Sequence, residues 1–246
     1  MDMNCSTLPA HAGWRGEWTG FFAFLRRPSL PGRPRGFGRA SLISTLHLLP
    51  LALILTCAGL TVANLASLAA PQLPGNRLLD LPLGQLALFA ILVAPITEET
   101  AFHGWLSGRP GHIAFIAIML GGGAFALVAV QDQMLRAGLL IGTVAAACIS
   151  LALLRRARTL PLFQQHFPWF YAASSGSFAL LHIVNQSETV GWFSLVLVLP
   201  QLLIGLVLGY ARVANGLWSS MLLHAGSNGV LVSLIAVLTL QAGAAA

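Results

Sequence analysis

Long apolar runs, separated by short polar stretches, make up most of the chain after residue 40. A helix needs about 20 mostly apolar residues to cross the roughly 30 Å hydrocarbon core of a bilayer. Seven runs are candidates: Leu42–Leu68, Leu83–Trp105, Ile113–Val130, Ala137–Leu154, Pro168–Val184, Trp192–Ala211 and Gly216–Leu240. Gly and Pro recur inside them, which membrane helices tolerate. The pattern predicts an all-α fold, a polytopic membrane helix bundle with about seven transmembrane helices.

The first 40 residues have a different pattern, rich in Arg, Pro and Gly. In the stretch 26–35 these residues alternate closely, and proline both removes a backbone donor and clashes with the preceding turn. A continuous helix is therefore excluded there. We divide the chain into a cytoplasmic tail at 1–40 and a transmembrane bundle at 41–246.

The composition supports a membrane protein, with 57% hydrophobic and 8% charged residues. An ordinary soluble domain has roughly 25% charged residues, so a soluble enzyme, a disordered chain and a coiled coil are all excluded. The three cysteines, Cys5, Cys57 and Cys148, are too few and too scattered for a disulfide framework.

The basic residues indicate an orientation. All 13 are Arg, and with a cytoplasmic N-terminus the seven spans place every one except Arg77 and Arg136 inside. The positive-inside rule predicts this asymmetry, and it puts the C-terminus on the opposite side. The Arg residues form no basic face typical of nucleic-acid binding, so we expect the lipid bilayer as partner and no nucleic acid. The expected location is a multi-pass protein of a bacterial-type plasma membrane.

Two adjacent carboxylates, Glu98 and Glu99, lie in the second apolar run. Each costs about 2.5 to 3.5 kcal/mol at the centre of a membrane helix unless a partner compensates it. One alternative is that the helix ends at Thr97 and leaves both in the headgroup region. We favour a helix that continues through them. Neighbouring side chains point about 100° apart, so one carboxylate serves chemistry while the other is held by a partner such as His103, one turn later.

Two further apolar runs carry His182 and His224, and Asn228 shares a helix face with His224. A single membrane histidine is usually an interhelical hydrogen-bond donor. A carboxylate, two imidazoles and a carboxamide on three spans form a set that can activate water, bind an oxyanion or hold a metal.

At these residues the sequence resembles the CAAX protease and bacteriocin-processing (CPBP, or Abi) family of intramembrane proteases. The family carries Glu-Glu-x-x-x-Arg, Phe-x-x-x-His and His-x-x-x-Asn or Asp on three separate helices. Here the motifs appear at 98–103, 178–182 and 224–228. The resemblance covers a core at 83–240. Its first two motifs are farther apart than usual in the family, so we expect an inserted hairpin at 112–155.

The resemblance implies an intramembrane endopeptidase that hydrolyses a peptide bond in a membrane-associated or prenylated protein or peptide. Glu98 would be the general base on a water molecule and His182 would help to position that water. His224 and Asn228 would donate hydrogen bonds to the tetrahedral oxyanion.

Other residues receive supporting roles from the same resemblance. Glu99 is the second motif carboxylate, with His103 and Phe178 as supporting residues. Family members have been described as metalloproteases, and Glu98, His182 and His224 would be the three ligands if a metal is used. Asn is a poor zinc ligand and no His-Glu-x-x-His motif is present, which favours a metal-independent mechanism. The cofactor expectation is therefore none, or a divalent metal such as zinc.

Two alternatives stay open. His103 stands where the family has Arg, which favours a catalytically inactive member that acts as a membrane scaffold or immunity protein. A proton-coupled transporter is the third possibility, because intramembrane Glu and His can form relays. The sequence shows no inverted repeat, which argues against a transporter.

Overall fold

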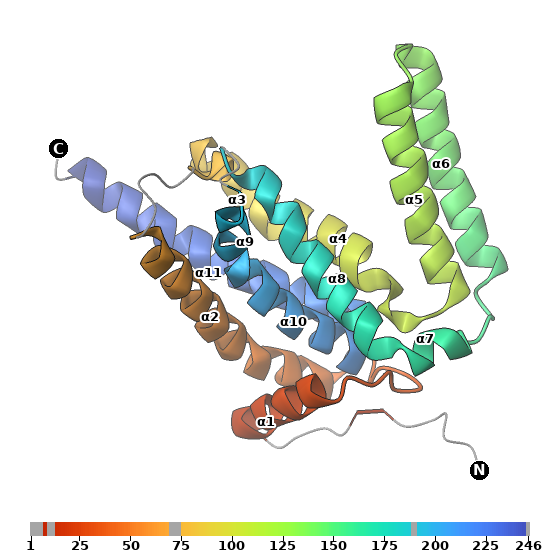
Figure 1. Ribbon diagram of the computed structural model, residues 1–246, viewed down its shortest axis with the longest axis horizontal. Coiled ribbons are helices and arrows are strands. Elements are labelled where there is room, and N and C mark those ends of the chain that lie inside the picture. The colour runs from red at the N-terminus through yellow and green to blue at the C-terminus, as the bar shows by residue number, and fades with distance from the viewer. Residues whose placement is uncertain (1–6, 9–12, 69–74, 188–190, 245–246) are drawn as a thin grey trace.

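The computed structural model describes residues 7–8, 13–68, 75–187 and 191–244. Within these ranges the fold is a bundle of helices without a β-strand, apart from one isolated bridge between Asn76 and Gln186 (Figure 1). The predicted all-α membrane bundle is confirmed.

The elements are α-helices and short 3-10 or π-helical turns. The α-helices are α1 (Gly13–Arg26), α2 (Arg39–Ser67), α3 (Leu83–Leu88), α4 (Ala94–Glu98), α5 (Pro110–Ala129), α6 (Gln133–Leu153), α7 (Pro161–Gln165), α8 (Phe167–Leu181), α9 (Phe193–Leu197), α10 (Leu199–Ala214) and α11 (Leu217–Ala244). The short turns are η1 (Arg77–Asp80), η2 (Phe89–Val93), η3 (Glu99–His103), η4 (Gly104–Ser107) and η5 (His182–Asn185), of which η2 and η3 are π-helical.

Five helical stretches of the described chain are long and apolar enough to cross a membrane. They are Arg39–Ala66, Leu83–Ser107, Pro110–Ala129, Gln133–Leu153 and Leu217–Gln241. The other two expected spans correspond to shorter helices, because α8 has 15 residues and the sixth run divides into α9 and α10. Pro200 lies at the start of α10, where a missing backbone N–H costs nothing. The number seven stays a prediction.

The second run is helical from Leu83 to Ser107 and passes through both glutamates. The alternative that it ends at Thr97 is therefore wrong, and Leu106 beyond it is 1% exposed. Two π-helical turns interrupt the run, η2 before the glutamates and η3 at Glu99 itself. Such turns widen the helix locally and occur frequently at functional sites.

Helix α10 lies at the centre of the bundle and packs against α2, α8 and α11 (Figure 1). Its residues from Val207 to Ala214 are all buried. Small residues allow this close approach, as is usual between membrane helices. A Cβ at Gly59 of α2 would come within 2.7 Å of the Pro200 Cα, and one at Gly209 within 2.8 Å of the Tyr171 ring.

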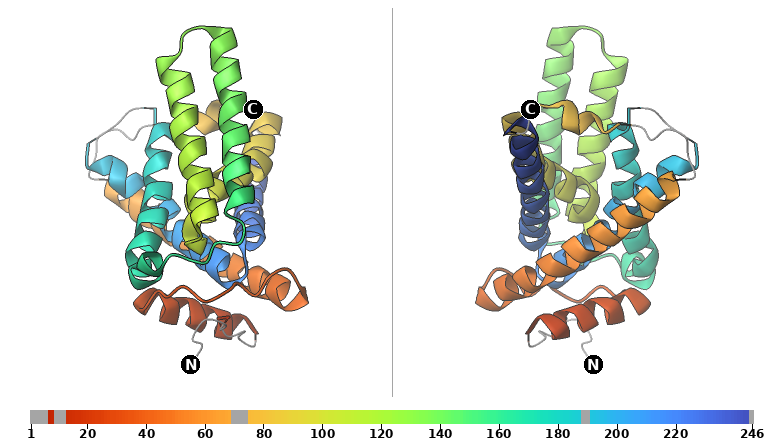
Figure 2. Two further views of the ribbon diagram at one scale, coloured as in Figure 1. Left: turned by 90° about the vertical axis from the view of Figure 1, so that its right-hand side faces the viewer. Right: turned by 90° about the vertical axis from the view of Figure 1, so that its left-hand side faces the viewer.

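The predicted tail contains a helix that its composition did not indicate. Helix α1 lies across one end of the bundle against α2 and α10 (Figure 2). Phe21 and Phe24 pack on the ring of Tyr210, and Glu17 pairs with Arg35 at 3.3 Å. The stretch between α1 and α2, where the prolines lie, is non-helical as expected.

Helices α5 and α6 form an antiparallel hairpin that extends away from the rest of the bundle (Figures 1 and 2). Its base meets the bundle through η3 and η4. Large apolar side chains such as Phe125, Val128 and Ile141 are exposed along it, as expected for a surface that faces lipid. The hairpin overlaps the segment 112–155, whose status as an insertion in the family fold stays a prediction.

Most of the segments that carry Arg gather at one end of the bundle. Helix α1, the beginnings of α2 and α5, and the ends of α6 and α10 all lie towards this end (Figure 1). The tip of the hairpin, next to Arg136, lies at the other end. This arrangement is the one that the predicted orientation requires, and the cytoplasmic location of the N-terminus stays a prediction.

We expect Gly59→Ala to lower the unfolding midpoint of the purified protein, because the new Cβ would press against the backbone of Pro200. Overpacking of this kind costs about 1–3 kcal/mol. Gly121→Ala in α5 is the matched control, since a Cβ there meets nothing within 4 Å. Equal midpoints for the two variants would contradict the close contact between α2 and α10.

Candidate active site

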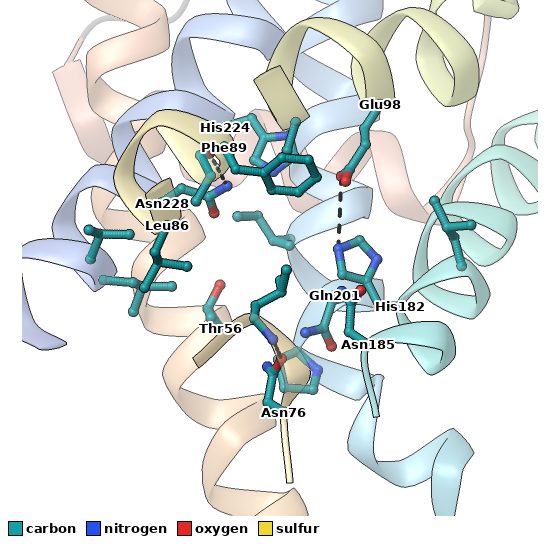
Figure 3. A pocket seen from close by; sticks show the side chains of 18 of the residues that line it. Thr56, Asn76, Leu86, Phe89, Glu98, His182, Asn185, Gln201, His224 and Asn228 are labelled. Carbon is teal, nitrogen blue, oxygen red and sulfur yellow. Dashed lines mark hydrogen bonds and ion pairs between the residues drawn. The ribbon is translucent and has the colours of Figure 1, made fainter. Parts of the chain in front are cut away.

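Glu98 and Glu99 point into different surroundings, as their helical spacing predicted. Glu99 is 0% exposed and lies inside the bundle, where η3 packs against α11. Glu98 lies on the wall of a cavity (Figure 3). The two carboxylates therefore have separate partners and separate roles.

The Glu99 carboxylate accepts hydrogen bonds from three side chains. His103 Nδ1 donates to Oε2 at 2.9 Å, and His224 Nδ1 donates to Oε1 at 2.9 Å. The Ser220 hydroxyl also donates to Oε2. The contact with His103 is the one expected from the sequence. Ser220 was not predicted, although it lies one turn before His224 on the same face of α11 and this spacing could have indicated it.

Arg212 is a second residue that the sequence did not assign to the site. Its side chain is 7% exposed and lies in the last turn of α10. Arg212 Nε donates to the His103 carbonyl at 3.2 Å, and Nη2 donates to the Gly104 carbonyl at 3.1 Å. These bonds hold the end of η3, and with it Glu99 and His103, against the central helix.

The cavity encloses about 360 Å³ and brings together Glu98, His182, His224 and Asn228, the four residues expected to share one (Figure 3). Most of its lining residues are apolar, and many of these come from η2, α8, α10 and α11. Further polar side chains that the sequence did not single out also line it. They are Thr56, Asn76, Asn185 and Gln201.

His182 faces Glu98 across this cavity. The distance from His182 Nε2 to Glu98 Oε2 is 3.8 Å, which is too long for a direct hydrogen bond. His182 Nδ1 donates to the Phe178 carbonyl at 2.8 Å, one turn earlier. The proton of a neutral ring is therefore on Nδ1, and Nε2 is an acceptor directed at the carboxylate.

His224 and Asn228 present polar atoms from successive turns of α11. Because His224 Nδ1 is bonded to Glu99, its Nε2 is the nitrogen left for the cavity. Asn228 Nδ2 donates one hydrogen to the Ala90 carbonyl at 2.7 Å, so the second amide hydrogen stays available.

Phe178 lies at the centre of the three histidines. Its ring centroid is 4.8 Å from that of His182 and 5.6 Å from those of His103 and His224. The side chain is 1% exposed. These three ring contacts limit the rotation of the imidazoles. Such packing is what a supporting role for Phe178 requires.

The zinc-type ligand set does not fit this arrangement. In the part of the chain that the structure describes, no group of three or more His, Cys, Asp or Glu side chains is placed to hold a metal ion. The chemistry below therefore uses only side chains of this protein.

A family model described as type II CAAX prenyl endopeptidase Rce1-like matches residues 81–230. The chain belongs to this family. Membership confirms the resemblance inferred from the three motifs, and it implies protease activity in general. No curated protein and no solved structure matches the chain. The matched range contains Glu98, His182, His224 and Asn228, the four cavity residues that the motifs carry.

We expect Glu99→Gln to destabilise the protein strongly. The amide keeps the shape but removes a buried charge that accepts three hydrogen bonds, and breaking a buried ionic network costs about 3–5 kcal/mol. Glu98→Gln is the matched control and should change stability by less than about 1 kcal/mol, because buried Glu98 Oε2 has no hydrogen-bond partner. Unfolding midpoints of both variants measure this difference. A larger loss for Glu98→Gln would reverse the assigned roles.

Proposed function

We propose that this Rce1-like protein is an intramembrane endopeptidase in which Glu98 activates water to hydrolyse a peptide bond. The observation that carries the proposal is the pairing of a carboxylate without a hydrogen-bond partner at Oε2 with an imidazole acceptor across a cavity. Adjacent Glu99 is fully engaged elsewhere, which leaves Glu98 as the carboxylate that reaches the cavity.

The base and its partner act on one water molecule. Glu98 accepts a proton from the water as it attacks the carbonyl carbon, and it gives that proton to the amide nitrogen when the C–N bond breaks and the amine leaves. His182 Nε2 accepts a hydrogen bond from the other water hydrogen, because Nδ1 is held as a donor by the Phe178 carbonyl. The two acceptors together orient the oxygen lone pair towards the substrate.

Asn228 and His224 stabilise the oxyanion that forms. Asn228, with its free amide hydrogen, and His224 both line the cavity from α11. His224 donates from Nε2 only when both ring nitrogens carry protons, and its Nδ1–H is already held by the Glu99 carboxylate. One preorganised oxyanion donor typically contributes a factor of about 10²–10³ in rate.

Glu99 is a positioning residue in this proposal. It does not line the cavity and acts through His224, whose ring it orients. His103 provides the second donor to Glu99 in the place where the family has Arg. Because the contact to Glu99 is preserved by the imidazole, this substitution is compatible with an active enzyme.

The substrate proposed is a membrane-associated or prenylated protein or peptide. The family is described as type II CAAX prenyl endopeptidase Rce1-like, which suggests such a substrate. The apolar walls beside Glu98, such as Leu86, Phe89 and Ile204, suit an apolar side chain or a lipid chain next to the scissile bond.

Glu98→Gln should abolish hydrolysis of a farnesylated peptide with a CAAX terminus by the protein in liposomes. The amide cannot accept the proton of the water, although the fold is retained. Asn228→Ala is the comparison variant and should keep activity reduced by about 10²–10³, because it removes one oxyanion donor and leaves the base. Hydrolysis by Glu98→Gln at the wild-type rate would contradict the proposal.

Treatment with a chelator should leave this hydrolysis unchanged, because Glu98, His182, His224 and Asn228 supply the base and the donors. The measurement compares rates before treatment, after removal of divalent ions, and after addition of zinc. Complete loss that zinc restores would show that a metal ion participates and would overturn the metal-independent mechanism.

A further inference from the structure

A second cavity of about 260 Å³ lies at the Arg-bearing end of the bundle. The stretch between α1 and α2 forms one wall, the junction of η4 and α5 another, and the end of α10 a third. Three guanidinium groups and an imidazole line it, from Arg33, Arg109, Arg212 and His112. This cavity is separate from the one that contains Glu98, and the two share no lining residue.

The positive charges of this cavity have no acidic partner in the described chain. Arg35 is the only arginine there that forms an ion pair, and its partner is Glu17. The other described ion pairs join Glu98 or Glu99 to histidines. Like charges that share a partly buried space repel one another, since protein surroundings screen them less than water does. The cluster therefore favours a bound anion.

The arginines that line this cavity keep hydrogen-bond donors available. Arg212 is buried and uses Nε and Nη2 for backbone carbonyls, while Nη1 has no bond within the described residues. Arg33 and Arg109 are exposed. Arg109 also precedes the first turn of the 20-residue helix α5, which has no side-chain cap, so the positive end of its dipole opens towards the same place.

The wall made by the tail is fixed to the bundle. The backbone N–H of Arg35 donates to the Ala214 carbonyl at 2.8 Å, next to the end of α10. On the opposite wall the Ser107 hydroxyl and His112 Nδ1 are 2.7 Å apart, and Thr159 donates to the Ser107 carbonyl at 3.2 Å. The cavity is thus built from hydrogen-bonded segments.

We propose that this cavity binds a phosphate group, either as a free phosphate ion or as the headgroup of an anionic phospholipid. The planar guanidinium fork matches phosphate oxygens, and the forks of Arg33 and Arg109 line this small space together with Arg212, which keeps one guanidinium nitrogen free. The expected topology places this end of the bundle at the cytoplasmic headgroup layer, where anionic lipids are enriched. Because Arg212 also holds the carbonyls of His103 and Gly104, a bound phosphate stabilises the turn that carries Glu99.

The experiment uses the full chain and measures its unfolding midpoint. In detergent, inorganic phosphate is titrated against chloride at equal ionic strength. In nanodiscs, pure phosphatidylcholine is compared with a mixture that contains phosphatidylglycerol. The double variant Arg33→Gln/Arg109→Gln removes two exposed charges from the cavity. Arg156→Gln/Arg158→Gln is the matched control, since it removes two exposed charges from the same end of the bundle but outside the cavity.

We expect phosphate, phosphatidylglycerol or both to raise the midpoint of the wild type. The cavity variant should need at least about tenfold more phosphate for the same rise, because each lost charged hydrogen bond is worth roughly one factor of ten. A response to free phosphate identifies an ion site, and a response to phosphatidylglycerol alone identifies a headgroup site. The proposal is overturned if neither ligand raises the midpoint, or if the control variant loses as much of the response as the cavity variant.

Discussion

The buried carboxylate of Glu99 is the constraint on which the rest of this structure depends. A charge without solvent contact is tolerated only where hydrogen-bond donors surround it, and here they come from two elements. His103 belongs to the same π-helical turn, whereas His224 and Ser220 belong to α11. Burial of Glu99 therefore fixes the helical stretch Leu83–Ser107 against α11.

The same constraint determines where the polar groups of the cavity point. Once Glu99 is directed towards α11, Glu98 must face a different direction, because adjacent side chains on a helix diverge by about 100°. Glu99 also occupies one nitrogen of His224 and leaves the other for the cavity. A structural network and a chemical site are thus built from two neighbouring residues, and Phe178 packs between their histidines.

Much of the site was predictable because polar groups are expensive in a membrane. Lipid cannot offset the free-energy cost of burying isolated polar side chains, so the polar residues of the motifs were expected to share a cavity. The structure places all four in one, namely Glu98, His182, His224 and Asn228. The contact between His103 and Glu99 followed from a spacing of one turn. Such local spacings and burial costs can be read directly from a sequence.

Features that depend on tertiary contacts could not be predicted. Helix α1 is stabilised by Phe21 and Phe24 against α10, far away in the sequence. The sequence indicated Arg212 only as one of the cytoplasmic arginines. Its hydrogen bonds go to backbone carbonyls, which every residue has, so no side-chain pattern in the sequence could reveal them. The division of the sixth run into α9 and α10 places Pro200 against Gly59, and only the packing of α2 reveals that contact.

The tautomer of His224 tests the central claim most directly, because Glu99 can orient this ring only through a proton on Nδ1. Nitrogen NMR of the protein in lipid, with ¹⁵N-labelled histidine, distinguishes protonated from bare ring nitrogens. The His224 signals are assigned by their loss in His224→Asn. The account predicts a protonated, hydrogen-bonded Nδ1 in the wild type. A bare Nδ1 on His224 in the folded wild type would contradict it.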